Sequence, residues 1–246
     1  MTEHQSGVPR LYIAAALSAN AEATLNRAQI HYLIDVLRLK PGDPVRVFNP
    51  SDGEWLAHLI AASKKGAVIR SSRHLAAATI PADIDYVFAP LKHSRLDYMV
   101  QKATEIGARR LRPVITRRTI VTRINLERMR ANVIEAAEQC NLIYVPEVYE
   151  AQPLSEVLAG WDHRRTAVYC DETAPVGNPL EALKSLSLPA AVIVGPEGGF
   201  TSEEREELRR LPFVTAISLG PRVIRADTAA IAALSLVQAT IGDWRT

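Results

Sequence analysis

Hydrophobic and polar positions follow two different patterns along the chain, and the pattern changes at Ile84. Before that point, short apolar runs alternate with turn sequences. The predicted strands are "RLYIAAAL", "PVRVF", "EWLAHLIAAS" and "AVIRSSRHL". One segment, "AQIHYLIDVLRL", has apolar residues at helical spacing and ends at "KPGD". We expect a small β-rich domain over residues 1–76, which the linker "AAATIPAD" joins to the rest of the chain.

From Ile84 onward, predicted strands alternate with predicted helices. The strands are "IDYVFAPL", "RLRPVIT", "TAVYCD", "AAVIVG" and "VTAISLG". The helices are "RLDYMVQKATEIGA" and "NLERMRANVIEAAEQC", and a loop and a helix come after each of the last two strands. This alternation is typical of a mostly parallel sheet covered by helices. We therefore expect an α/β domain over residues 82–246 that binds ligands beyond the carboxyl ends of its strands.

Composition excludes several classes of protein. No apolar run is long enough to cross a bilayer, and the start, "MTEHQSGVPR", lacks the apolar centre of a signal peptide. We expect a soluble cytoplasmic protein. The chain has only two cysteines, Cys140 and Cys170, and its six histidines show no metal-ligand spacing. Neither a disulfide framework nor a metal site is expected.

Basic residues are concentrated in the middle of the chain. The formal net charge is +2 overall, but the 39 residues from Lys92 to Arg130 hold 11 basic and 3 acidic side chains. Such a bias favours a polyanionic partner, because neutralising phosphates releases counterions. A solvated basic face is the alternative.

The segment "VIVGPEGGFTSEE", residues 192–204, runs from a strand through a glycine-rich turn. Thr201 and Glu204 form a capping-box pattern, which predicts that a helix begins here. The spacing fits neither a Walker loop nor a dinucleotide fingerprint, since Phe200 comes after the last glycine where a Walker loop needs lysine. Glu197 would also repel phosphate. A tight turn without a ligand is the plain alternative.

A second segment, "SLGPRVIRADTAAIAAL" at residues 218–234, has a related pattern. It also ends a strand with Gly-Pro, then passes through Arg222 and Arg225 into an alanine-rich helix. Asp227 or Thr228 is predicted to cap that helix. Because the helix is apolar around most of its circumference, it is predicted to be buried, partly against another subunit. Two Gly-Pro loops at one sheet edge indicate a shared site.

Together these loops resemble the two signature loops of the SPOUT methyltransferases. In detail they are similar to the bacterial 16S ribosomal RNA (uracil-N3)-methyltransferase family. The resemblance extends over nearly the whole chain. Further matching blocks, in the expected order, are "RLYI", "HYLIDVLRLKPGDPVRVFNPSDGEW", "QKATEIGARRLRPVITRRT" and "EAAEQCNLIYVPEV".

The resemblance implies a PUA-like β-barrel at the amino end and an α/β domain with a deep trefoil knot. It also implies a homodimer that completes each active site and binds S-adenosylmethionine in the two loops. By similarity, the main-chain groups of Gly195, Leu219 and Ile224 are suited to recognising adenine through hydrogen bonds. Glu197 would contact the ribose or the sulfonium, or only form the turn. Asp171 and Glu172 would border the methionine part. The full expected cofactor-binding set is Val194, Gly195, Pro196, Glu197, Gly198, Gly199, Ser218, Leu219, Gly220, Ile224 and Thr228.

The implied reaction is methyl transfer to N3 of a uridine in 16S ribosomal RNA, in which the N3 proton must be lost. Arg225 is the favoured stabiliser of the resulting anion, with a phosphate clamp or a helix-start ion pair as alternatives. Glu105 is a weaker candidate for base or substrate orienter, against an ordinary salt-bridged helix position.

Six basic residues are expected to contact RNA, although each alone is equally consistent with surface charge: Arg10, Arg38, Lys92, Lys102, Arg117 and Arg118. The chain departs from the family pattern at two places. Ala226-Asp227 replaces the usual Thr-Glu, which shortens the carboxylate's reach, and Asn141-Leu142 replaces Gly-Arg, which removes a guanidinium.

Two rival hypotheses remain open on the sequence alone. One is an RNA-binding assembly factor with the same fold and little catalytic activity, since its basic block would look the same. The other is a related methyltransferase that acts on a different RNA position.

We predict that Arg118→Glu weakens RNA association and flattens its dependence on salt, because one phosphate contact would be lost. Binding titrations at several salt concentrations measure this. A salt slope equal to that of the unmodified protein would remove Arg118 from the RNA contacts.

Overall fold

The computed structural model describes residues 7–63, 66–175 and 177–245. Residues 1–6, which begin the segment "MTEHQSGVPR", lie outside the described residues. The chain divides into two compact units. One comprises the described residues up to Ile80 together with Ala137–Val145, and the other comprises Pro81–Ala136 and Pro146 onward. A middle segment of the sequence thus belongs to the first unit, which the sequence pattern did not indicate.

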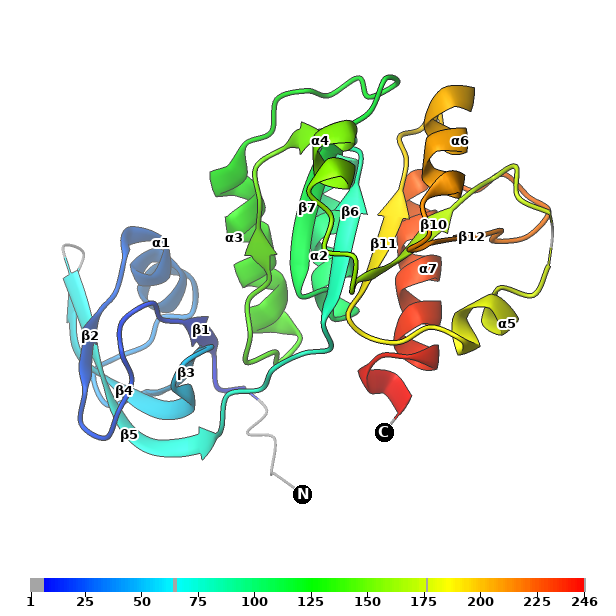
Figure 1. The fold of residues 1–246 in the computed structure, drawn as a ribbon. Helices are drawn as coiled ribbons and strands as arrows, with labels where there is room; N and C mark the ends of the chain where they lie inside the picture. Colours follow the sequence, from blue (N-terminus) through cyan, green and yellow to red (C-terminus); the bar gives the residue numbers. More distant parts are fainter. Residues whose placement is uncertain (1–6, 64–65, 176, 246) are drawn as a thin grey trace. The chain divides into compact units, whose positions relative to one another are not determined.

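The first unit is built on a five-stranded sheet with the order β1-β3-β4-β5-β2 (Figure 1). β1 pairs parallel with β3, and the other pairs are antiparallel. The strands are β1 (Arg10–Tyr12), β2 (Glu22–Thr24), β3 (Pro44–Asn49), β4 (Gly53–Ser63) and β5 (Gly66–Ala76). The predicted helix is present as α1 (Arg27–Ile30), which continues as a π-helix over His31–Val36. The pattern therefore predicted the helix and four of the five strands, but not the short β2 or the inclusion of residues 137–145.

Arg10 is buried within the first unit rather than exposed. Its side chain is 5% exposed and donates to Glu54 at 2.7 Å. It also donates to the carbonyls of Ala137 and Leu142, both at 2.7 Å, and its guanidinium lies 3.6 Å from the centre of the Phe48 ring. The Arg10 guanidinium therefore makes its hydrogen bonds and its ring contact inside the first unit, as a buried charge requires.

The second unit contains a parallel sheet with the order β12-β10-β11-β6-β7-β8, and β9 pairs with the end of β7. This confirms the predicted α/β alternation. The strands are β6 (Ile84–Phe88), β7 (Arg110–Ile115), β8 (Glu147–Val148), β9 (Gln152–Pro153), β10 (Thr166–Cys170), β11 (Ala190–Val194) and β12 (Val214–Ile217). The helices are α2 (His93–Glu105), α3 (Leu126–Gln139), α4 (Leu154–Ala159), α5 (Pro179–Lys184), α6 (Ser202–Arg210) and α7 (Ala226–Thr240), and a 3-10 turn at Asp243–Arg245 comes last.

Helices cover both faces of the central strands. On one face, Leu158 of α4 and Leu208 of α6 share a core with Tyr169 and Ile193. On the other, α2 and α7 pack together and α7 lies against β11. Both faces of β6 and β11 are therefore buried, which explains their uninterrupted apolar sequences. The sequence pattern missed β8, β9, α4 and α5, because elements of two to six residues are too short to establish a period.

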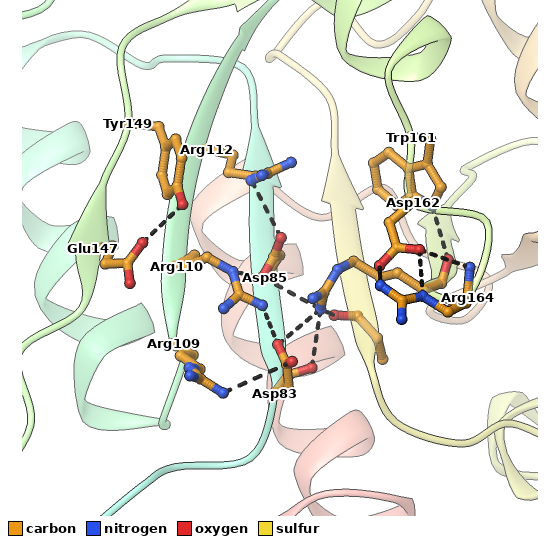
Figure 2. A network of polar contacts seen from close by, with 12 residues as sticks. Asp83, Asp85, Arg109, Arg110, Arg112, Glu147, Tyr149, Trp161, Asp162 and Arg164 are labelled. Carbon is orange, nitrogen blue, oxygen red and sulfur yellow. Dashed lines mark hydrogen bonds and ion pairs between the residues drawn. The ribbon is translucent and has the colours of Figure 1, made fainter.

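Buried charges tie the amino ends of several strands together (Figure 2). Asp85 of β6 is 1% exposed, and its carboxylate accepts from Arg110 at 2.6 Å. Arg112 and Arg165 lie 3.2 and 3.4 Å from the same carboxylate. Burial raises the pKa of Asp85, and the three guanidiniums oppose that effect. The cluster joins β6, β7 and the start of β10 through one carboxylate.

We predict that Asp85→Ala lowers the free energy of unfolding by up to about 3–5 kcal/mol, because Arg112 loses its counterion and Arg110 and Arg165 keep only the partly exposed Asp83. Asp162→Ala is the matched control. Its carboxylate pairs with Arg164, whose side chain is 86% exposed, so its loss should change the free energy of unfolding far less than the loss of Asp85. Denaturant unfolding measures both, and equal losses for the two variants would contradict the assigned role of Asp85.

Candidate functional site

A cavity of about 550 Å³ lies beyond the carboxyl ends of β10, β11 and β12. Three segments form most of its wall: residues 169–172, residues 218–226, and residues 194–200 except Gly198. Arg95 of α2, Arg205 of α6 and Ala229 of α7 complete it. The cavity is large enough for a cofactor-sized ligand, and it occupies the edge of the sheet that the alternating pattern predicted.

The first loop turns sharply between β11 and α6. Gly199 has φ +65°, and its N–H donates to the carbonyl of Pro196 at 2.9 Å. A Cβ added at Gly195 would lie 2.6 Å from a ring carbon of Phe200. Only glycine permits this approach, because the Phe200 ring is buried.

The predicted capping box at the start of α6 is confirmed. The Thr201 hydroxyl accepts from the N–H of Glu204 at 3.3 Å, and the Glu204 carboxylate accepts from the N–H of Thr201 at 2.9 Å. The same carboxylate accepts from the N–H of Arg117 at 2.8 Å. The cap thus also fixes the segment that comes after β7.

The second loop joins β12 to α7. Gly220 has φ +106°, a conformation that other residues rarely adopt. The loop's tip is open, with Val223 89% exposed. The predicted cap was wrong: the N-cap is Arg225, without a side-chain cap bond, and Asp227 and Thr228 already lie in the first turn. The Asp227 carboxylate accepts from the N–H of Thr228 at 3.0 Å and also pairs with an arginine from another helix.

Arg95 links the two loops. Its guanidinium donates to the Asp227 carboxylate through two nitrogens, at 3.1 and 3.0 Å, and forms an ion pair with Glu197. Burial raises the pKa of Asp227, but the hydrogen bonds from Arg95 and the N–H of Thr228, together with the charge of Arg95, outweigh it, and the pKa lies below its ordinary value. Arg95 was not among the site residues predicted from the sequence, because its two partners lie more than 100 positions away and no spacing rule connects them.

A third wall of the cavity comes after β10. The Asp171 carboxylate accepts from Thr173 at 2.8 Å and from Arg209 at 2.8 Å, and it is 2% exposed. Burial opposes ionisation, yet these donors hold the pKa of Asp171 below its ordinary value. Burial raises the pKa of the neighbouring Cys170 thiol to about 12, so this cysteine is protonated at neutral pH and is no nucleophile.

The structure brings most of the predicted cofactor residues together. Nine of the eleven line the cavity; Gly198 and Thr228 do not. Arg225 also lines it and is exposed. Glu105 does not line the cavity, and its carboxylate accepts from Lys102 at 2.8 Å.

The predicted RNA-contacting residues divide into two groups. Arg38, Lys92, Arg117 and Arg118 are exposed. Arg10 is buried by its contacts within the first unit, and Lys102 is held by Glu105. Arg118 has a structural contact as well, since it donates to the carbonyl of Gly198 at 2.8 Å.

Metal-ligand clusters and membrane-spanning helices are both absent from the described ranges. Residues 7–63, 66–175 and 177–245 contain no group of three or more histidine, cysteine or acidic residues placed to hold a metal ion. Within those same ranges, no helix is both long and apolar enough to span a membrane.

Comparison with known proteins gives matches over nearly the whole chain. A family profile described as an RNA methyltransferase domain matches residues 78–238, and an RNA methyltransferase PUA domain matches residues 25–70. The protein named ribosomal RNA small subunit methyltransferase E from Rickettsia conorii is 32% identical over 232 residues, covering 93% of this chain and 94% of its own. The protein of the same name from Synechocystis sp. is 32% identical, covering 94% and 78%.

Solved structures agree with these matches. The Neisseria gonorrhoeae ribosomal RNA small subunit methyltransferase E, bound to S-adenosylmethionine, is 25% identical with a TM-score of 0.82, over 96% of this chain and 99% of its own. A Legionella pneumophila methyltransferase in complex with the same cofactor is 27% identical with a TM-score of 0.81, over 96% and 99%. The chain belongs to the RNA methyltransferase family whose members are named ribosomal RNA small subunit methyltransferase E.

Proposed function

We propose that this chain binds S-adenosylmethionine in the cavity beyond β10, β11 and β12 and methylates N3 of a uridine in 16S ribosomal RNA. The observation that carries the proposal is the cavity itself, which two Gly-Pro loops and the end of β10 enclose. The family assignment supports the reaction type, and the resemblance of the two loops to those of the uracil-N3 enzymes supports the target atom.

The residues present fit the cofactor. A bound adenosyl group needs close backbone approach, and Gly195 and Gly220 keep the two loops free of side chains where they turn. The main-chain groups of Gly195, Leu219 and Ile224 would hold the adenine. When bound, S-adenosylmethionine supplies an activated methyl group on a sulfonium. Glu197, held by Arg95, places a carboxylate at the cavity that favours this positive charge.

Loss of the uracil N3 proton leaves negative charge on the ring, and we assign its stabilisation to Arg225. This guanidinium is exposed at the cavity wall, and within the described ranges no ion pair holds it. Its charge is therefore available to an incoming base. Glu105 stays a candidate only for orienting the substrate from outside the cavity, since Lys102 already occupies its carboxylate.

For the RNA we propose the exposed side chains of Lys92, Arg117 and Arg118 in the α/β domain and Arg38 in the amino-terminal domain. Arg10 and Lys102 are engaged inside the protein and are not carried forward. We assign an RNA-binding role to residues 1–76, and methyl transfer together with the remaining RNA contacts to residues 82–246.

The trefoil knot, the homodimer and a small-subunit particle as substrate derive from the resemblance, and the cytoplasmic location derives from the composition; all four stay proposals.

The direct test combines cofactor binding with mapping of the RNA. Isothermal titration should give saturable binding of S-adenosylmethionine. Mass mapping of 16S ribosomal RNA from a deletion strain should lack one methylated uridine, which a plasmid copy of the gene restores. The absence of cofactor binding would favour the assembly-factor hypothesis. Persistence of every uridine modification in the deletion strain would overturn the proposed target.

We further predict that Gly220→Val weakens S-adenosylmethionine binding by roughly 10-fold or more, because a β-branched residue is strained at φ +106°. Gly195→Val should have a similar effect through its clash with Phe200. Gly160→Ala is the control: it comes directly after α4, does not line the cavity, and its Cβ would meet no atom closer than 3.5 Å. Titration of each purified variant measures the effect, and undiminished affinity in both valine variants would contradict it.

A further inference from the structure

Three of the seven charged residues that line the cavity already have partners within the protein. Arg95 pairs with Glu197, which also lines the cavity, and with Asp227. Arg209 and Thr173 occupy the carboxylate of Asp171. These contacts hold the walls of the site in place.

Arg205 of α6 is different. It lines the cavity, and its Nε is buried without a hydrogen-bond partner. Across the described part of the chain, its guanidinium has no ion pair or hydrogen bond. A buried donor on a charged group costs free energy when it is left without a partner. Arg205 is thus arranged to gain an anionic partner when the cavity is filled.

Glu172, two residues after β10, provides an opposite charge in the lining of the same cavity. Its carboxylate lies against the first loop, because a Cβ added at Gly199 would lie 2.7 Å from its Oε1. Gly199 therefore leaves room for this side chain as well as making the turn. Glu172 pairs with no cation among the described residues, and it does not pair with Arg205.

A cation and an anion that face one cavity without neutralising each other match a zwitterion. An α-amino acid presents one carboxylate and one ammonium on adjacent bonds, so a guanidinium and a carboxylate can bind both ends of it at once. Arg222 and Arg225, which carry the other unpaired positive charges among the described cavity residues, are exposed on the second loop, whereas the Arg205 Nε is buried without a partner.

We propose that Arg205 binds the carboxylate, and Glu172 the ammonium, of the methionine portion of S-adenosylmethionine. This inference rests on the proposed function. It assigns the end of β10 and the inner side of α6 to the amino-acid part of the ligand, and leaves the two Gly-Pro loops to the adenosyl part.

The experiment compares two ligands that differ only in the carboxylate: S-adenosylmethionine and its decarboxylated form. Titration of the unmodified full chain should show a roughly 10- to 100-fold preference for the carboxylated ligand, the range expected for a hydrogen bond between charged groups. Arg205→Gln should lose most of that preference, and Arg205→Lys should keep part of it. Arg210→Gln is the matched control, because Arg210 lies on the same helix, pairs with Glu206 and does not line the cavity.

Glu172 is tested in the same way with a different pair of ligands. Glu172→Gln should weaken the binding of both S-adenosylmethionine and its decarboxylated form, since both carry the ammonium. It should leave the binding of 5′-methylthioadenosine unchanged, because that molecule has no amino-acid part.

The outcomes separate this inference from the proposed function. If the unmodified chain binds S-adenosylmethionine but shows no preference over the decarboxylated ligand, the role of Arg205 is overturned and the proposed function stands. The same holds if Arg205→Gln keeps the full preference. If the unmodified chain does not bind S-adenosylmethionine at all, both fall. If Arg205→Gln fails to fold, Arg205→Lys takes its place, and a full preference in that variant likewise overturns the role of Arg205.

Discussion

Parallel pairing of β10 with β11 on one side and β12 on the other is the constraint on which the site depends. The register sets Tyr169 beside Ile193, and Cys170 beside Ile217. Because the three strands run in the same direction, their carboxyl ends meet at one edge of the sheet. The chain must turn there after each strand, and the turns become the walls of the cavity. Without this pairing, the two Gly-Pro loops would not lie side by side and would not enclose a cavity.

Charge holds those walls in place. Arg95 connects the first loop to the start of α7, and Arg118 binds the carbonyl of Gly198. At the opposite ends of the strands, Arg110 and Arg112 surround Asp85. Much of the basic block between Lys92 and Arg130 therefore serves internal contacts. The net charge of this block is therefore larger than the charge that it presents to RNA, because only the exposed side chains, such as Arg117, are available for binding.

Local features were the ones that could be predicted. The capping box of Thr201 and Glu204 spans three positions and was found in the structure as expected. The strand-helix alternation was also correct, since each element carries its own period. The cap of α7 was not predicted correctly, because the N-cap is Arg225 and not Asp227 or Thr228. The Asp227 carboxylate accepts from the N–H of Thr228 in the first turn and also pairs with Arg95, and no local pattern reports this long-range ion pair.

Residue order alone specified the two domains' character, the two glycine loops and the family, because these depend on short-range propensities and motifs. Folding decided which charges meet. The burial of Arg10, the use of Arg95 as a link between loops and the unpaired state of Arg205 and Glu172 each depend on residues far apart in the chain. Two charged groups pair only when they lie close together in space, and residues far apart in the sequence come that close only when the sheet has formed.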